Sequence, residues 1–293
     1  MSKEQSRLPV RKMYKLYING AFVRSESGRS DPLADGSAST ANIARASRKD
    51  VRDSVVAARA AQAKWWKTAP GTRGLILYRL AEMIESRAAE FVTRVREGAE
   101  LPQSEAQREV EAAIDRTIWY AGWCDKYSAL LSTRNPVGGP HFNFSTPEPT
   151  GVVGVIAPDQ PALLGLVSVV LPALVGGNSV VVIASETDPR SAITFAEALE
   201  TSDFPAGVIN ILTGQRAELA PVLAKHMDVN ALAFIDTDTA YTTDLQRLSA
   251  DNVKRTHPIQ NRKRDDWYLP DLQSLDAIAN FSEIKTIWHP AGI

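Results

Sequence analysis

The chain offers few side chains that could act as a nucleophile or hold a metal ion. Its one cysteine, Cys124, lies in the stretch WYAGWCDKY, inside a segment expected to be helical. A thiol could act as a nucleophile, but free cysteine is usually buried, so we predict an inert side chain on a helix face. The histidines show no metal-ligand spacing: His141, His226, His257 and His289. The sequence therefore predicts no metal site and no catalytic thiol.

The elements that would position any site are built around one stretch, Thr150 to Pro189. The apolar runs Val152 to Ala157 and Ser179 to Ile183 are typical of buried strands. Between them lies an apolar segment of helical length, Pro161 to Val175, and the following glycine doublet can stop a helix. Strand, crossover helix and strand form a βαβ unit, and runs apolar on both faces suit a parallel sheet. The predicted fold class is therefore α/β.

Composition excludes several classes of protein. The 293 residues are 44% hydrophobic and 23% charged, enough for a large core in one or two domains. The formal net charge is -1, and the basic run Lys254 to Arg264 is followed at once by Asp265 and Asp266, which favours a solvated loop over a nucleic-acid patch. A single cysteine excludes an internal disulfide. No apolar run approaches the ~20 residues of a membrane span, and no signal-peptide pattern opens the sequence. We expect a cytoplasmic protein with no nucleic-acid or membrane partner.

Several further elements are predicted from local patterns. MYKLYINGAFV predicts a hairpin turning at Asn19-Gly20, since both residues tolerate positive φ. Three helices are expected from apolar residues on one face: one opened by Asp50 as N-cap and closed by Trp65 and Trp66, one from Thr72 to Glu97, and one from Pro102 to Leu131.

A proline- and glycine-rich segment, RNPVGGPHFNFSTPEP, follows the third helix. Its alternating FNFST fits an exposed strand. Near the end of the chain, Trp267, Tyr268 and Trp288 are expected to pack the tail onto the domain rather than to form a stacking platform.

The central stretch resembles the cofactor-domain core of the aldehyde dehydrogenase superfamily. GVVGVIAPDQPALL followed by LPALVGGNSVVVIASETDP carries the resemblance, with YINGAFVRSESG and DVRDSVVAARAAQAKW before it and FPAGVINILTG after it. Together these motifs cover about the first 240 residues in the family's order. The resemblance implies a Rossmann-like cofactor domain, and it gives the segment RNPVGGPHFNFSTPEP the role of a protruding association hairpin.

Most of the family's functional positions are altered in this chain. The resemblance places Asp159 where the family has an aromatic residue and Gln160 where it has the asparagine that donates a hydrogen bond to the oxyanion. Ile183 stands in place of the lysine that grips the adenosine ribose. The residual cofactor-binding positions are Ser185, Glu186 and Gly214.

The expected diphosphate-binding turn is altered as well. The family places a glycine-rich turn here, where backbone N–H groups approach the pyrophosphate. Asp236 and Tyr241 fill the two glycine positions, and the carboxylates of Asp236 and Asp238 would face a diphosphate and repel it. We therefore expect weak or absent NAD binding, and no cofactor.

The catalytic part of the family's pattern is missing after this turn. Ile259 stands at the position of the general-base glutamate, and no cysteine follows it. The last stretch, Phe281 to Ile293, resembles the family's C-terminal strand, which joins the association hairpin. No catalytic residue is predicted. The chain resembles the catalytically silent C-terminal half of the tandem (family sixteen) aldehyde dehydrogenases.

These comparisons predict an organisation and a function. We expect a helical part of the cofactor domain over 1–133, a protruding association segment over 134–150, a Rossmann-like core over 151–265 and a tail with an association strand over 266–293. The foremost hypothesis is a pseudoenzyme subunit that pairs with a complete aldehyde dehydrogenase, or with itself, through strands carrying Phe142, Phe144, Ile284, Ile287 and Trp288. The alternatives are a nucleotide- or metabolite-binding regulator that uses the residual crevice, and an NAD-dependent aldehyde oxidoreductase in its own right.

Overall fold

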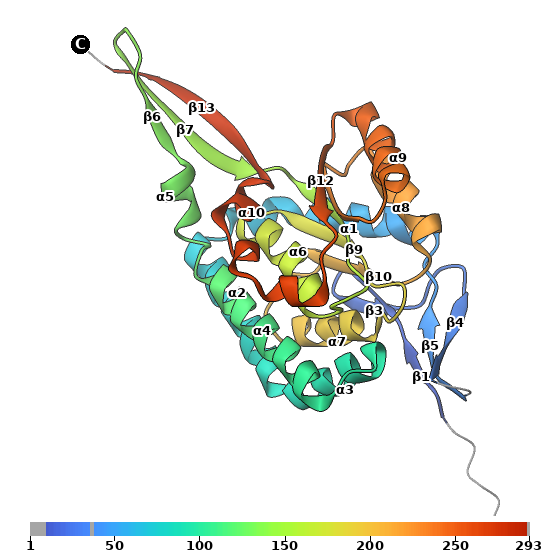
Figure 1. Cartoon of the computed structure of the whole chain (residues 1–293). Helices are drawn as coiled ribbons and strands as arrows, with labels where there is room; N and C mark the ends of the chain where they lie inside the picture. The colour runs from blue at the N-terminus through green and yellow to red at the C-terminus, as the bar shows by residue number, and fades with distance from the viewer. Residues whose placement is uncertain (1–9, 36–37, 292–293) are drawn as a thin grey trace, which may run out of the picture.

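The fold is built on one mixed sheet of seven strands in the computed structural model, which describes residues 10–35 and 38–291 (Figure 1). Across the sheet the strands follow the order β12 (Arg255–Gln260), β11 (Ala231–Asp236), β8 (Val152–Ile156), β9 (Ser179–Ile183), β10 (Ile209–Leu212), β2 (Leu16–Ile18) and β3 (Ala21–Val23). The strands from β12 to β10 are parallel, and β2 and β3 add an antiparallel edge. The predicted α/β class is confirmed.

The βαβ unit forms the centre of this sheet. β8 and β9 pair in parallel, and α6 (Leu164–Val175), which connects them, is buried along its whole length. Successive side chains of a strand point to opposite faces, so Val180 and Val182 join one core and Val181 and Ile183 join the other. Both faces of the central strands are therefore covered.

Two layers of helices cover the sheet. One face packs against three helices, α1 (Arg48–Lys67), α8 (Arg216–Lys225) and α9 (Thr239–Ser249). The other face packs against α6 and α7 (Arg190–Leu199), and three helices pack on the outside of these two: α2 (Pro70–Ser86), α3 (Ala88–Ala99) and α4 (Gln103–Ala121). A separate small sheet pairs β1 (Lys12–Tyr14), β5 (Ala38–Ala44) and β4 (Ser30–Asp35).

The predicted hairpin is confirmed, but the helix boundaries differ from the predictions. Asn19 and Gly20 have φ of 52° and 73° and connect β2 to β3. Asp50 is not the N-cap of α1: Ser47 caps the helix, and Asp50 closes a capping box from the third helical position. The predicted helix 72–97 is two helices that are separated at Arg87. The sequence did not indicate the break, because the apolar periodicity continues across it.

The third predicted helix also ends early, at Ala121. A series of turns follows before the short helix α5 (Tyr127–Leu131). Cys124 therefore lies in a turn and not on a helix face, although its predicted burial is confirmed at 1% exposure.

A three-stranded arm extends from the body beyond α5 (Figure 1). It consists of β6 (Thr133–Asn135), β7 (His141–Pro149) and β13 (Ser282–Pro290). β13 pairs with β7 over its full length, from Ser282 opposite Pro149 to Pro290 opposite His141. The FNFST strand is thus the central strand of the arm, flanked on both sides, and not the exposed edge that its sequence suggested.

The segment between β12 and the arm folds back beside α6. It contains two 3₁₀ turns, η2 (Arg264–Tyr268) and η3 (Pro270–Leu272), and the short helix α10 (Leu275–Ala279). Trp267 and Ile278 anchor this segment in the core, at 1% and 0% exposure. Trp288, which was expected to help pack the tail onto the domain, is 61% exposed on the arm, so that part of the prediction is wrong.

The capping box of α1 gives a test of the fold. Asp50 is buried and accepts hydrogen bonds from Ser47 N at 2.7 Å, Ser25 Oγ at 2.7 Å and Glu26 N at 3.2 Å. We expect Asp50→Ala to lower the free energy of unfolding by about 1–3 kcal/mol, because it leaves buried donors unpaired. Urea unfolding measures the change.

Asp53→Ala is the matched control on the same helix. Asp53 pairs with Lys49, and both side chains are 50% exposed. Its removal should change the free energy of unfolding by less than about 0.5 kcal/mol. Equal losses in the two variants would contradict the role given to Asp50.

Candidate functional site

The sheet has a topological switch point at β8. The chain proceeds from β8 to β9 and β10 on one side, and then returns to β11 and β12 on the other side of β8. Ligands of open parallel sheets bind beyond the carboxyl ends of the strands at such a point. The candidate site is therefore the region beyond the carboxyl ends of β8, β9 and β11, which we call the switch-point crevice.

An ion pair crosses this crevice. The guanidinium of Arg216, at the start of α8, donates to both carboxylate oxygens of Asp159, from Nη1 at 2.7 Å and from Nη2 at 2.8 Å. Nη2 also donates to the carbonyl oxygen of Ala157 at 2.7 Å, directly at the end of β8. This bidentate pair is geometrically specific, and it fills the position above the strand end with the chain's own side chains.

Asp159 also organises the loop after β9. Its Oδ1 accepts from the backbone N–H of Glu186 at 2.8 Å and of Thr187 at 3.3 Å, and from Ser185 Oγ at 3.1 Å. Burial alone would raise the pKa of Asp159, but Arg216 and these N–H groups outweigh it, so the pKa lies below its usual range. Asp159 is therefore held as a carboxylate.

The structure brings together the three residues predicted to remain from a cofactor site. Ser185, Glu186 and Gly214 line one cavity of about 200 Å³, which also has wall residues from β4 and β5. Glu186 is already engaged, because its Oε2 accepts from the backbone N–H of Arg216 at 3.1 Å. Gly214 has a structural role as well: its φ is 142°, and a Cβ there would lie 3.1 Å from the backbone N of Ala46.

In the turn after β11, the polar side chains form hydrogen bonds with other residues of the chain. Asp238 is the N-cap of α9 and accepts from Tyr241 N at 2.8 Å, while Asp236 accepts from the hydroxyl of Thr242. The ring of Tyr241 packs edge-on to Phe234, with ring centroids 6.3 Å apart. Burial raises the pKa of Tyr241, and its buried hydroxyl has no hydrogen-bond partner among the described residues. The turn after β11 is thus the capped start of a helix with an aromatic side chain packed beside it.

Gln160, at the position of the predicted oxyanion donor, is held by the segment after β12. Its Oε1 accepts from Arg264 at 2.9 Å, and Arg264 also pairs with Glu109 of α4. The Glu109 side chain is fully buried and accepts from the backbone N–H of Leu163 at 2.8 Å and of Leu164 at 3.2 Å. Burial raises the pKa of Glu109, although Arg264 and these N–H groups lower it in part. The Gln160 amide oxygen therefore accepts a hydrogen bond within a network that connects the segment after β12 to α4.

Two further kinds of chemical group could form a reactive centre in the described ranges 10–35 and 38–291, the cysteine thiol and a cluster of metal ligands. Burial raises the pKa of the Cys124 thiol to about 12, so the thiol stays protonated at neutral pH. Among the described residues, no group of three or more potential ligands could hold a metal ion. No helix in the same part of the chain is long and apolar enough to cross a membrane.

The basic run near β12 is not a free cationic patch. Arg255 pairs with Glu283, Arg262 with Asp271 and Arg264 with Glu109. Lys254 is buried rather than solvated, and its ammonium donates to the carbonyl of His226 at 2.8 Å.

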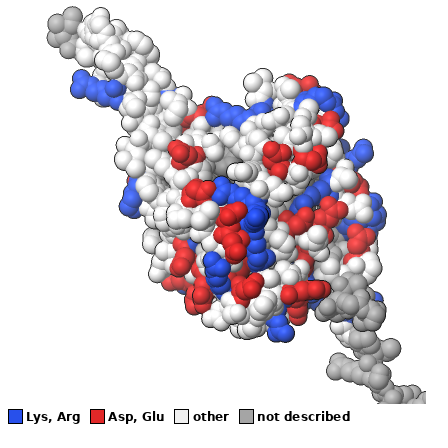
Figure 2. All heavy atoms as spheres, in the orientation of Figure 1, with Lys and Arg blue, Asp and Glu red and all other residues white. Residues whose placement is uncertain are grey.

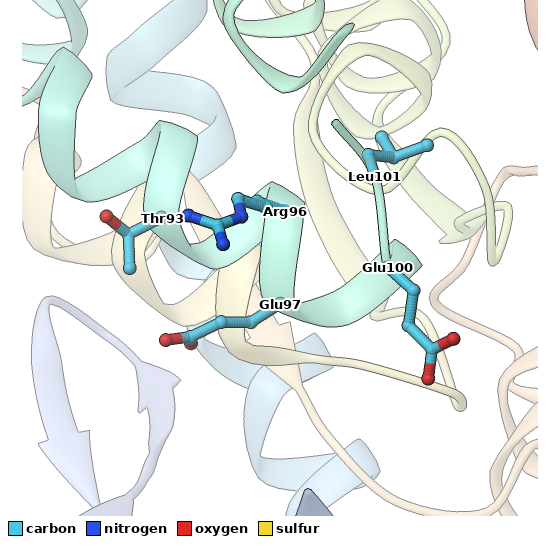
Figure 3. A pocket seen from close by; sticks show the side chains of 5 residues that line it. All are labelled: Thr93, Arg96, Glu97, Glu100 and Leu101. Atoms are coloured by element: carbon cyan, nitrogen blue, oxygen red, sulfur yellow. The ribbon is translucent and has the colours of Figure 1, made fainter. Parts of the chain in front are cut away.

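A surface hollow of about 390 Å³ lies at the C-terminal end of α3 (Figure 3). Its walls are Thr93, Arg96, Glu97, Glu100 and Leu101, all from one helix end. Glu97 is already paired with Arg94 and Arg190, both at 3.1 Å. The hollow has a single apolar wall residue, so it is a weaker candidate than the crevice.

The arm is the second candidate site, as an association surface. Its two faces carry different residues: Phe142, Phe144 and Ile287 lie on one face, and Ile284 and Trp288 on the other. Phe142, Ile284 and Trp288 are 42%, 59% and 61% exposed. The arm presents few charged side chains in the view of Figure 2, in contrast to the body. β13 is an edge strand of its sheet, so it could pair with a further strand.

The fold and crevice define an α/β protein of the dinucleotide-binding type, and comparison with known proteins specifies the family. The model of the aldehyde dehydrogenase family matches residues 26–257. The protein DhaS of Bacillus subtilis, named as a putative aldehyde dehydrogenase, is 32% identical over 269 residues, which cover 90% of this chain and 54% of that protein. The chain belongs to the aldehyde dehydrogenase family.

Solved structures agree with this assignment. The NAD+ complex of aldehyde dehydrogenase from Bacillus cereus matches with a TM-score of 0.80 at 26% identity, over 85% of this chain and 51% of that one. The protein HpcC from Thermus thermophilus matches with a TM-score of 0.81 at 29% identity, over 86% and 49%. The chain spans about half the length of these relatives.

The pair between Asp159 and Arg216 predicts a pH dependence of stability. The folded-state pKa of Asp159 lies below the unfolded value, about 3.9. Its contribution to stability is therefore present above about pH 4 and is lost as the pH falls through the folded-state pKa. We expect Asp159→Asn to lower the free energy of unfolding by about 1–3 kcal/mol at pH 7, and this difference from wild type to shrink below about pH 4.

Urea unfolding of both proteins from pH 7 to pH 3 measures this difference. Asp244→Asn is the control, because Asp244 pairs with Arg247 on the exposed face of α9, where a salt bridge contributes less than about 1 kcal/mol. A difference between wild type and Asp159→Asn that stays constant down to pH 3 would contradict the assignment.

Proposed function

We propose that this chain is a non-catalytic subunit that associates, through its arm, with a complete aldehyde dehydrogenase or with a second copy of itself. The observation that carries the proposal is the arm, which combines an open edge strand with exposed apolar side chains, Phe142, Ile284 and Trp288. Large apolar side chains gathered on a projecting sheet mark an association surface. In this proposal the arm is the part of the family's fold that the chain uses for association.

The crevice supports the non-catalytic half of the proposal. The Arg216–Asp159 pair lies over the end of β8, and Tyr241 stands where the predicted glycine would let a diphosphate approach. The thiol that the described residues contain, Cys124, is buried and protonated. We infer that the chain binds NAD weakly or not at all and has no aldehyde-oxidising activity of its own.

The first experiment is a pull-down of the tagged chain from the cells that encode it, followed by native mass measurement of the complex. We expect a stoichiometric complex that contains a full-length aldehyde dehydrogenase, or a discrete homo-oligomer. A chain that emerges as a monomer at micromolar concentration would sink the proposal.

Variants of the arm locate the contact. Ile287→Lys and Ile284→Lys place a charge on opposite faces of β13, and desolvating that charge in an interface costs binding energy. We expect at least one of them to weaken association by tenfold or more, about 1.4 kcal/mol, while the fold is retained. Leu75→Lys is the control, since Leu75 is 71% exposed on α2 of the body. Loss of association in the control alone would place the interface elsewhere.

A second function has one observation in its favour, the cavity lined by Ser185, Glu186 and Gly214. In this alternative, the chain is a regulator that binds a nucleotide or a related metabolite there. A thermal-shift screen with adenine nucleotides tests it, with Glu186→Gln as the matched variant. A stabilisation that disappears in Glu186→Gln would support the alternative, and no shift with any nucleotide would remove it.

A further inference from the structure

A second cavity lies beside the core helix α6, beneath the segment that follows β12. It has a volume of about 360 Å³ and is lined by α6, β12 and the segment from Arg262 to Phe281. We call it the tail cavity. Its apolar walls include Val169, Pro172 and Leu272. Small-molecule sites of proteins span roughly 300 to 1,000 Å³, and the volume of the tail cavity lies in that range, with walls that are about half apolar and half polar.

Two polar atoms at this cavity lack a partner. Arg262 Nε and His257 Nε2 are buried and have no hydrogen-bond partner among the described residues. Arg262 pairs with Asp271 through Nη1 at 2.7 Å, which leaves the Nε side of its guanidinium free. Burial and the neighbouring Arg255 lower the pKa of His257, so its imidazole is neutral at pH 7. Buried polar groups are normally paired, so the unpaired Nε–H of Arg262 at this cavity indicates a missing acceptor or a bound water.

A buried positive charge lies behind the same wall. Arg116 of α4 is only 3% exposed, and its Nη1 donates to Ser168 Oγ, which lines the cavity, at 2.5 Å. The Nε of Arg116 is buried and has no hydrogen-bond partner among the described residues. Two charged side chains interact with the Arg116 guanidinium through space: Asp271 stabilises its positive charge, and Arg262 destabilises it. A buried guanidinium without a closely paired anion is costly.

We propose that the tail cavity binds a small organic carboxylate, with its apolar body between α6 and α10 and its carboxylate directed toward Arg262 and the charge of Arg116. The inference goes beyond the proposed subunit role and does not depend on it. A single negative charge fits better than a phosphate dianion, because Asp271 and Asp276 also line the cavity and would repel a second charge. The planar guanidinium of Arg262 matches a carboxylate geometrically.

Calorimetric titration of the full chain tests the charge requirement without any substitution. The probes are two pairs of equal shape, benzoate with benzamide and hexanoate with hexanamide. We expect at least one carboxylate to bind and its amide to bind roughly tenfold more weakly, the effect of losing a charge-assisted hydrogen bond. Equal affinity for an acid and its amide would overturn the proposal, as would no heat from either acid at millimolar concentration.

Two variants test the place of binding. Arg262→Gln removes the charge, and Ala277→Trp fills the cavity from α10 without changing the charge. We expect each variant to weaken binding of the same carboxylate about tenfold or more. Arg247→Gln, on the exposed face of α9, is the control and should bind as wild type does. Binding that persists in both Arg262→Gln and Ala277→Trp, with the fold intact by circular dichroism, would place the ligand elsewhere and overturn the proposal.

Discussion

Both faces of the central parallel strands are covered by helices, and this constraint decides where the protein can meet other molecules. α6 is buried throughout, and Val180 to Ile183 of β9 are divided between two cores. The faces of the central strands are thus closed to ligands. Among the described residues, the strand ends, the tail cavity beside β12, the outer helix surfaces and the arm remain accessible. At the strand ends, the chain's own Arg216 and Asp159 form a bidentate pair. The position that normally receives a ligand in this type of fold therefore holds side chains whose hydrogen bonds are already formed within the chain.

The segment after β12 also forms hydrogen bonds and an ion pair with polar groups inside the body. Arg264 connects Gln160 to the buried Glu109, and Trp267 anchors the segment in the core. From there the chain reaches the arm, where β13 pairs with β7 along its full length. The strand ends of the body therefore use their polar groups internally, whereas the arm gathers three large exposed apolar side chains, Phe142, Ile284 and Trp288, on one projecting sheet. This contrast is the physical basis for proposing association, and not chemistry, as the chain's role.

The core of the fold could be predicted from sequence because its signals are local and strong. Apolar runs of strand length around a helical segment predicted β8, α6 and β9, and Asn19-Gly20 predicted the hairpin. Helix ends were predicted less well, since apolar periodicity continues across the break at Arg87 and the true cap, Ser47, lies three residues before the aspartate that was expected to serve as one. The polar pairs could not be predicted in the same way. Arg216 and Asp159 are 57 residues apart, and Arg264 and Glu109 are 155 apart, so only the tertiary fold brings each pair together.

Calorimetric titration of the chain with NAD tests the central claim, that this member of the family retains the fold without the cofactor chemistry. We expect no heat of binding at millimolar NAD, because Arg216, Asp159 and Tyr241 occupy the switch-point crevice. A dissociation constant in the micromolar range would contradict it and would show that the crevice opens to admit the dinucleotide.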